Sequence, residues 1–255
     1  ASAVVTEKLG YKFDIRTPHD VAFFSPSKTH LELHFDLIEE NEDIRAALTR
    51  VWEDSVSDPD FPGGAVMSAE MFTTYHFAHM AKHFLGGGCG VRPLLDLWII
   101  GNNMTLDEQK LDALLSECKL QKFALEMMNL SDVWFSGCEH NDITREAADY
   151  ILGAGVYGKL ENRIAIAQNN KKQGKLGYVI GRIFLPYSKM KRMYPRLEKY
   201  PILLPFYEIK RWFRYFSRRG THAAKREMRL NNAVTNEKKE RLSAMCKSLQ
   251  LSDKR

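Results

Sequence analysis

The chain has 255 residues, enough for one large domain or two small ones with a buried core. Its hydrophobic share of 44% and charged share of 27% are those of an ordinary globular protein, and no apolar run is long enough to span a bilayer. None of the four cysteines forms a CxxC pair, which excludes a zinc ribbon or a dense disulfide framework; we expect free thiols in a reducing cytoplasm.

The net charge of +5 conceals a strong asymmetry along the chain. Residues 1–160 contain 13 Lys and Arg against 25 Asp and Glu, a net charge of −12. Residues 161–255 contain 24 against 7, a net charge of +17. We therefore expect the two halves to attract each other, and the basic half to be able to meet an anionic partner.

In chain order, residues 3–9 are predicted to be helical and residues 12–16 and 21–25 to be strands. Residues 29–38 alternate strictly between apolar and polar side chains, which predicts a strand with one buried face that forms an antiparallel hairpin with residues 21–25. After Glu40 the strands are expected to stop. Helices are predicted for the segments 41–56, 68–85, 93–100, 105–118, 121–134 and 142–152, followed by proline-punctuated helices over 176–216 and a helical tail over 221–249.

The polar face of the strand at 29–38 carries His30, Glu32, His34 and Asp36. Side chains two apart on a strand point the same way, so two carboxylates and two imidazoles share one surface. Such a cluster can bind a divalent metal. The alternative is an ordinary solvated face of an edge strand.

Two further groups occur in the helical part. His76, His79 and His83 fall within about 60° of one another on one helix, so they could ligate a metal, contact a substrate or pack against a neighbouring helix. Arg92 and Asp96 are four residues apart in an apolar helix. We expect Asp96 to be buried and paired with Arg92 or a histidine, because a carboxylate in such a helix needs a partner.

Basic and aromatic residues interleave over 207–219, as they do in nucleic-acid binders and in helices at membrane interfaces. The alternative is an amphipathic helix that docks on the acidic half of the chain.

The ordered set of Leu9-Gly10-Tyr11 and the segments 31–35, 75–84 and 90–98 resembles the uncharacterised nucleotidyltransferase family of the polymerase-β-like nucleotidyltransferase superfamily. The segment from Phe184 also looks like the later part of that family, so the resemblance covers residues 1–135 well and the remainder loosely.

This resemblance implies an α+β fold in which a small nucleotidyltransferase sheet that binds NTP with Mg²⁺ is followed by a mostly helical domain. It implies that Glu32 is the catalytic, metal-binding carboxylate of a later strand. The expected substrate-binding residues are His34, Asp36, His76, His79, His83, Arg92 and Asp96. The activity implied for the full-length parent is transfer of a nucleoside monophosphate from NTP to a hydroxyl or phosphate acceptor.

The sequence departs from the family pattern at its start, because no Gly-Ser turn followed by Asp-x-Asp lies upstream of Gly10. We therefore expect a remnant sheet domain at 1–40, a helical domain at 41–160 and a basic helical region at 161–255, in a chain that is inactive as this fragment. The alternative function is a non-catalytic helical module whose basic region engages nucleic acid or a protein.

Overall fold

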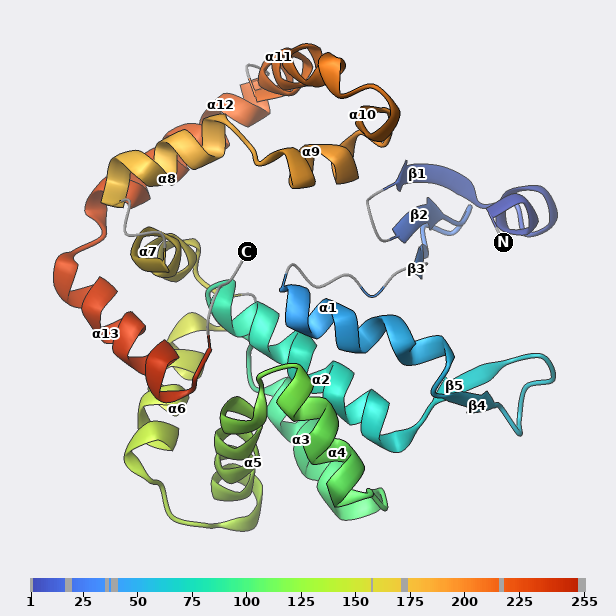
Figure 1. Cartoon of the computed structure of the whole chain (residues 1–255), viewed down its shortest axis with the longest axis vertical. Helices are drawn as coiled ribbons and strands as arrows, with labels where there is room; N and C mark the ends of the chain where they lie inside the picture. The colour runs from blue at the N-terminus through green and yellow to red at the C-terminus, as the bar shows by residue number, and fades with distance from the viewer. Residues whose placement is uncertain are drawn as a thin grey trace. The chain divides into compact units, whose positions relative to one another are not determined.

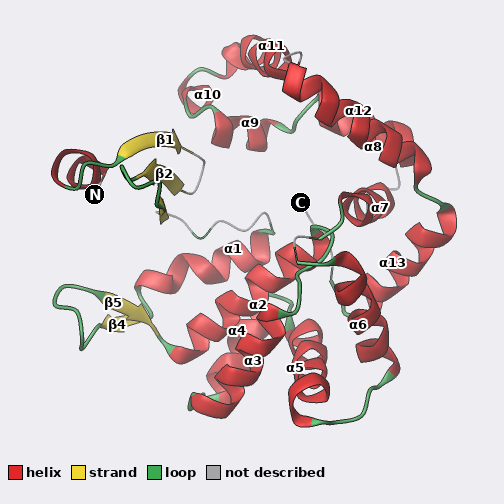
Figure 2. Cartoon of the chain, turned by 180° about the vertical axis from the view of Figure 1, so that it is seen from behind, coloured by secondary structure: helices red, strands yellow, loops and turns green. Residues whose placement is uncertain are grey.

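The computed structural model describes residues 2–16, 20–34, 37, 41–156, 158–170, 174–215 and 218–251. The chain is α+β, and its described residues form two small antiparallel sheets and many helices (Figures 1 and 2). It divides into two compact units. Unit 1 comprises residues 1–38 and 184–214, and unit 2 comprises residues 39–183 and 215–255. The three regions expected from the sequence stay a prediction, because a grouping by contacts is not a division by function.

Unit 1 begins with a single turn of π-helix, η1, followed by a three-stranded antiparallel sheet in the order β1-β2-β3. The bounds are Val4–Lys8 for η1, Lys12–Arg16 for β1, Asp20–Phe24 for β2 and His30–His34 for β3. The predicted hairpin is confirmed, and its turn is closed by the Ser25 amide on the Thr29 carbonyl at 2.9 Å. The strand predicted over 29–38 ends at His34, and Phe35, Asp36 and Ile38 lie outside the described residues.

The rest of unit 1 is a chain of short helices in which prolines stand at or near the starts. Pro186 and Pro195 directly precede α9 and α10, and Pro201 opens η3, positions that need no backbone N–H. Met190, Leu197 and Tyr207 form the buried core of this segment. The bounds are Tyr187–Met193 for α9, Arg196–Lys199 for α10, Pro201–Leu203 for η3 and Leu204–Tyr215 for α11.

Unit 2 starts with α1 and a 3-10 turn, η2, which are followed by a β-hairpin that the sequence did not predict. The helix expected over 41–56 ends early, because residues 55–57 pair with residues 65–67 around the Pro- and Gly-rich loop. The bounds are Glu42–Leu48 for α1, Thr49–Trp52 for η2, Ser55–Ser57 for β4 and Ala65–Met67 for β5.

Helices α2 to α5 form the best-buried part of unit 2. Their bounds are Ala69–Leu85 for α2, Arg92–Asn103 for α3, Glu108–Glu117 for α4 and Gln121–Ser136 for α5. Ser68 caps α2, with its hydroxyl accepting from the Met71 amide at 3.3 Å. The helix predicted over 105–118 begins only at Glu108, because Asp107 caps α4, accepting from the Lys110 amide at 3.0 Å. The largest fully buried side chains of this core are Phe77, Phe84, Phe123, Met71, Met80, Leu94, Leu97, Met127 and Leu130.

The remaining helices of unit 2 pack on one another, α13 against α6 and α7, and α12 against α7 and α8. Their bounds are Asp142–Ala154 for α6, Leu160–Asn170 for α7, Gly174–Ile183 for α8, Arg218–Ala233 for α12 and Asn236–Ser248 for α13. Buried Gln168 joins α7 to α12 by donating to the backbone and side-chain oxygens of Asn231 at 3.1 and 2.8 Å. Within the described ranges, no helix is both long enough and apolar enough to cross a membrane.

The glycine run after α2 allows the backbone to pack closely against α6 and the start of α7. The Gly87 carbonyl accepts from the Lys159 amide at 3.0 Å, which ties the end of α2 to the start of α7. At Gly88, where φ is +137°, a Cβ atom would lie 2.3 Å from the Cβ of Ala154 on α6. Only glycine allows both this backbone conformation and this close approach.

We expect Gly88→Ala to lower the free energy of unfolding of unit 2 by about 2–4 kcal/mol, because the new methyl group strains the backbone and overlaps Ala154. The matched control is Gly153→Ala, since a Cβ at Gly153 in α6 would meet nothing within 4 Å. That control should be stabilised by about 0.5–1 kcal/mol. Urea denaturation followed by circular dichroism measures both, and equal stability of Gly88→Ala and wild type would contradict the packing role.

A polar network fixes the start of α2 against α4. The Lys110 ammonium contacts Asp54 at 2.8 Å, Glu70 at 3.4 Å and the Ser68 hydroxyl at 3.2 Å, and the other Glu70 oxygen accepts from the Asp107 amide at 3.0 Å. The Asp107 amide holds the pKa of Glu70 below its ordinary value against the effect of burial. Partial burial raises the pKa of Asp54, but hydrogen bonds from Lys110 and Ser68 outweigh it, so the pKa is lowered.

Because both carboxyl pKa values are lowered in the folded state, their stabilisation is present at neutral pH and is lost as the pH falls through those lowered values. We expect Lys110→Met to cost about 1–3 kcal/mol at neutral pH, where it leaves two carboxylates without their cation. The difference from wild type should shrink as both carboxyls become protonated in acid.

The control for this prediction is Lys119→Met, which removes an exposed ion pair with Asp43 and should cost less than about 1 kcal/mol. Urea denaturation at a series of pH values is the measurement. A Lys110→Met deficit that persists unchanged in acid would show that the lysine acts by packing and not by charge.

Candidate metal centre

The pairing of β2 with β3 sorts the sheet into an apolar face and a polar face. Val21 lies opposite Leu33 and Phe23 opposite Leu31, and these side chains pack with Val5 of η1. On the other face, Asp20 lies opposite His34, Ala22 opposite Glu32 and Phe24 opposite His30. The predicted alternation of residues 30–34 is therefore confirmed over β3, where the histidines and Glu32 are the more exposed positions.

Asp20, Glu32 and His34 form a group of three metal-ligating side chains. One ligand atom of each lies within 4.8 Å of the other two. Asp20 is buried, whereas the side chains of Glu32 and His34 are 47% and 44% exposed. The group thus has one fixed carboxylate at its base and two donors that a ligand can reach from solvent.

Glu32 is the central member of this face. Its Oε2 atom lies 3.4 Å from His34 Nε2, and its Oε1 atom lies 3.7 Å from His30 Nδ1. The His30 ring is held by stacking on Phe24, with ring centroids 4.7 Å apart. The residue opposite Glu32 is Ala22, whose small side chain leaves space above the sheet for the carboxylate.

The donor set fits a hard or borderline divalent cation. Carboxylates suit Mg²⁺ and Mn²⁺, and an imidazole suits Mn²⁺ and the later transition metals. Mg²⁺ commonly uses one or two protein carboxylates and keeps several water ligands, which a half-exposed site allows. Within the described residues, no other set of three His, Cys, Asp or Glu side chains approaches this geometry.

Sequence reasoning found Glu32 and His34 but missed Asp20. The signal was present, because Asp20 stands two residues before Ala22 on a strand whose register is set by the five-residue turn after Phe24. Counting back from the turn pairs Asp20 with His34. Asp36, the other residue expected here, lies outside the described residues.

The remaining predicted site residues belong to unit 2, and the structure does not gather them into a ligand set. His76 Nε2 lies 2.9 Å from the Pro93 carbonyl and links α2 to α3, while His79 and His83 face each other at 3.0 Å on the exposed side of α2. The predicted pairing of Asp96 with Arg92 is confirmed, with Arg92 Nε 4.0 Å from Asp96 Oδ2. The predicted burial is wrong, because the Asp96 side chain is 41% exposed and that of Arg92 is 91% exposed, so the pair lies at the helix surface.

Two of the buried cysteines, Cys89 and Cys118, are poor candidates for thiolate ligands or nucleophiles at neutral pH. Burial raises the pKa values of Cys89 and Cys118 to about 12. All four cysteines are free thiols.

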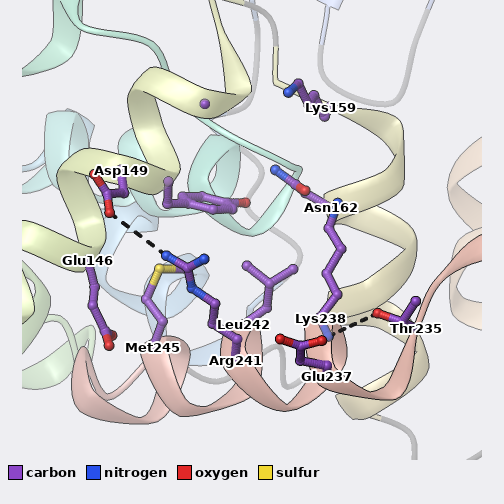
Figure 3. A pocket seen from close by; sticks show the side chains of 12 residues that line it. Glu146, Asp149, Lys159, Asn162, Thr235, Glu237, Lys238, Arg241, Leu242 and Met245 are labelled. Carbon is purple, nitrogen blue, oxygen red and sulfur yellow. Dashed lines mark hydrogen bonds and ion pairs between the residues drawn. The ribbon is translucent and has the colours of Figure 1, made fainter.

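A pocket of about 370 Å³ in unit 2 lies between α6, α7 and α13 (Figure 3). Three acidic and three basic side chains line it: Glu146, Asp149, Glu237, Lys159, Lys238 and Arg241. Arg241 lies 3.8 Å from Asp149, and Lys238 lies 2.8 Å from Glu161. Because these charges balance, the pocket has no evident preference for an anion such as a nucleotide.

Residues 3–136 match the profile of the uncharacterised nucleotidyltransferase family. The chain belongs to this family. The match spans the three-stranded sheet, including Asp20, Glu32 and His34, and continues to the last residue of α5. No match was found among curated proteins or among solved structures.

Nucleotidyltransferases generally use a divalent metal, so family membership supports the interpretation of Asp20, Glu32 and His34 as a metal site. We expect Mn²⁺ to bind the chain at this group and Glu32→Gln to weaken that binding by about 10–100-fold or more, because the central ligand loses its charge. Isothermal titration with Mn²⁺ measures the affinity.

The matched control is Asp14→Asn on β1, an exposed carboxylate of the same sheet that lies outside the group of three. It should leave the affinity unchanged. Equal Mn²⁺ affinity of wild type and Glu32→Gln would rule out this group as the metal centre.

Proposed function

We propose that this protein takes part in nucleotidyl transfer, moving a nucleoside monophosphate from an NTP to a hydroxyl or phosphate acceptor with Mg²⁺ bound at the Asp20, Glu32 and His34 group. The observation that carries the proposal is the presence of that group within the segment that matches a nucleotidyltransferase family. A bound divalent cation would neutralise phosphate charge and make an acceptor oxygen more acidic.

The three side chains differ in exposure, and this suggests a different role for each. Buried Asp20 is fixed by the strand and would anchor the ion from below. Glu32 is reachable from solvent and would both ligate the ion and accept the acceptor's proton, as a carboxylate beside the reacting oxygen can. His34, 3.4 Å from Glu32, would orient that carboxylate and contact the substrate.

The other predicted substrate-binding residues differ in how far their side chains are exposed or already bonded. Arg92 is almost fully exposed and His79 and His83 lie on an exposed helix face; all three belong to unit 2, and their role in substrate binding stays a prediction. His76 is engaged with the Pro93 carbonyl and is better explained as a residue that positions α3.

The test is Mg²⁺-dependent release of pyrophosphate from ATP or GTP, with water as the acceptor; detectable release would overturn the expectation, drawn from the sequence, that this fragment is inactive. Glu32→Gln should lower this rate by about 100-fold or more, since several kcal/mol of transition-state stabilisation depend on the metal. Asp14→Asn should retain the wild-type rate, and circular dichroism should show that both variants are folded. A fully active Glu32→Gln variant would end the assignment.

A further inference from the structure

Helix α11 in unit 1 has two faces of different character. Tyr207 belongs to the small core formed with Met190 and Leu197, and Glu208 and Arg211 are buried on the same side. The Arg211 guanidinium donates to Glu208 Oε2 at 2.6 and 2.9 Å, and Glu208 Oε1 accepts from the Leu185 amide at 3.2 Å. These bonds fix how α11 is rotated about its axis.

The opposite face of α11 is apolar and open to solvent. Phe206, Ile209 and Phe213 recur at the spacing of one helical face and are 61%, 48% and 73% exposed. Ile202, in the turn just before α11, is 87% exposed. We call these four residues the apolar stripe. A row of large apolar side chains facing solvent is typical of a surface that binds a partner protein or a membrane.

The segment that bears the apolar stripe is strongly basic. Residues 184–214 contain eight Lys and Arg and two Glu, a net charge of +6. Both glutamates already have cations beside them, Glu198 bonding Lys191 at 3.3 Å and Glu208 bonding Arg211. Lys210 is exposed on the face of the stripe itself. The partner must therefore offer both apolar material and negative charge.

We propose that the apolar stripe and the surrounding cations bind an anionic lipid surface, with α11 lying in the plane of the interface. A bilayer surface offers acyl chains to the stripe and headgroup phosphates to the lysines and arginines. Single-stranded nucleic acid would satisfy the charge but not Ile202 and Ile209, which have no ring for base stacking. A second copy of the chain would bring two segments of charge +6 together.

The test compares sedimentation of the chain with vesicles of phosphatidylcholine alone and with vesicles of an equimolar phosphatidylcholine and phosphatidylglycerol mixture. Binding is expected with the second only, and it should weaken in high salt. The triple variant Phe206→Ser, Ile209→Ser, Phe213→Ser should raise the lipid concentration for half-binding at least about 100-fold, and Lys210→Glu about tenfold or more.

The matched control replaces three equally exposed apolar residues of unit 2, with Trp52→Ser, Phe61→Ser and Leu152→Ser, and should bind vesicles like wild type. All variants alter exposed side chains, and circular dichroism checks that they fold. The proposal is overturned if anionic vesicles are not bound, if the stripe variant binds as well as wild type, or if the control loses binding equally. If vesicles are not bound, binding of a labelled single-stranded oligonucleotide tests whether the stripe contacts nucleic acid. Light scattering then tests whether it forms a dimer interface.

Discussion

The pairing register of β2 with β3 is the constraint on which the candidate site depends. With Asp20 opposite His34 and Ala22 opposite Glu32, every potential ligand lies on one face and every large apolar side chain of β3 on the other. A slip of one residue would turn Leu31 and Leu33 toward the ligands and the carboxylate toward Val5 and Phe23. Burial of the apolar face and the turn after Phe24 both oppose such a slip. The energy that folds the sheet thus also assembles the three donors.

The helical unit relies on close backbone approach instead of register. The glycines after α2 let the chain pass against α6 and the start of α7, and the Lys159 amide and the Asn162 side chain both donate to the Gly87 carbonyl, at 3.0 and 3.3 Å. A glycine-rich loop after a helix could suggest phosphate binding. Here the amides of Gly87 and Gly88, which a phosphate would need as donors, already donate to the Phe84 and His83 carbonyls at 3.2 and 3.1 Å, and the φ values at Gly87 and Gly88 serve the packing.

The sequence predicted those features that depend on local periodicity. The alternation at residues 30–34 and the apolar spacing of α2, α5 and α6 come from contacts each segment makes with a single core, so composition and spacing suffice. What it missed depends on distant partners. The strands β4 and β5 are three residues each and form only because they pair across a loop, so Val56 was assigned to a helix.

The errors at individual residues have the same origin. Asp20 joins the site through cross-strand pairing, which a single strand's pattern does not display. Asp96 was expected to be buried because its neighbours are apolar, yet α3 turns that position outward while Leu94 and Leu97 enter the core. The helix predicted over 105–118 begins only after Asp107, whose amide donates to Glu70, a partner 37 residues away in the sequence.

The folded arrangement also changes how the charge asymmetry should be interpreted. Counted along the sequence, the site belongs to an acidic half of charge −12, which would repel a triphosphate. Grouped by contacts, residues 1–38 and 184–214 together contain 12 Lys and Arg against 7 Asp and Glu, so unit 1 carries +5, whereas unit 2 carries 25 of each and is neutral. The unit that contains Asp20, Glu32 and His34 is therefore the basic one. A divalent ion on Glu32 would make it more positive still, so long-range electrostatics favours the approach of anions, nucleotide and lipid headgroup alike, to this unit.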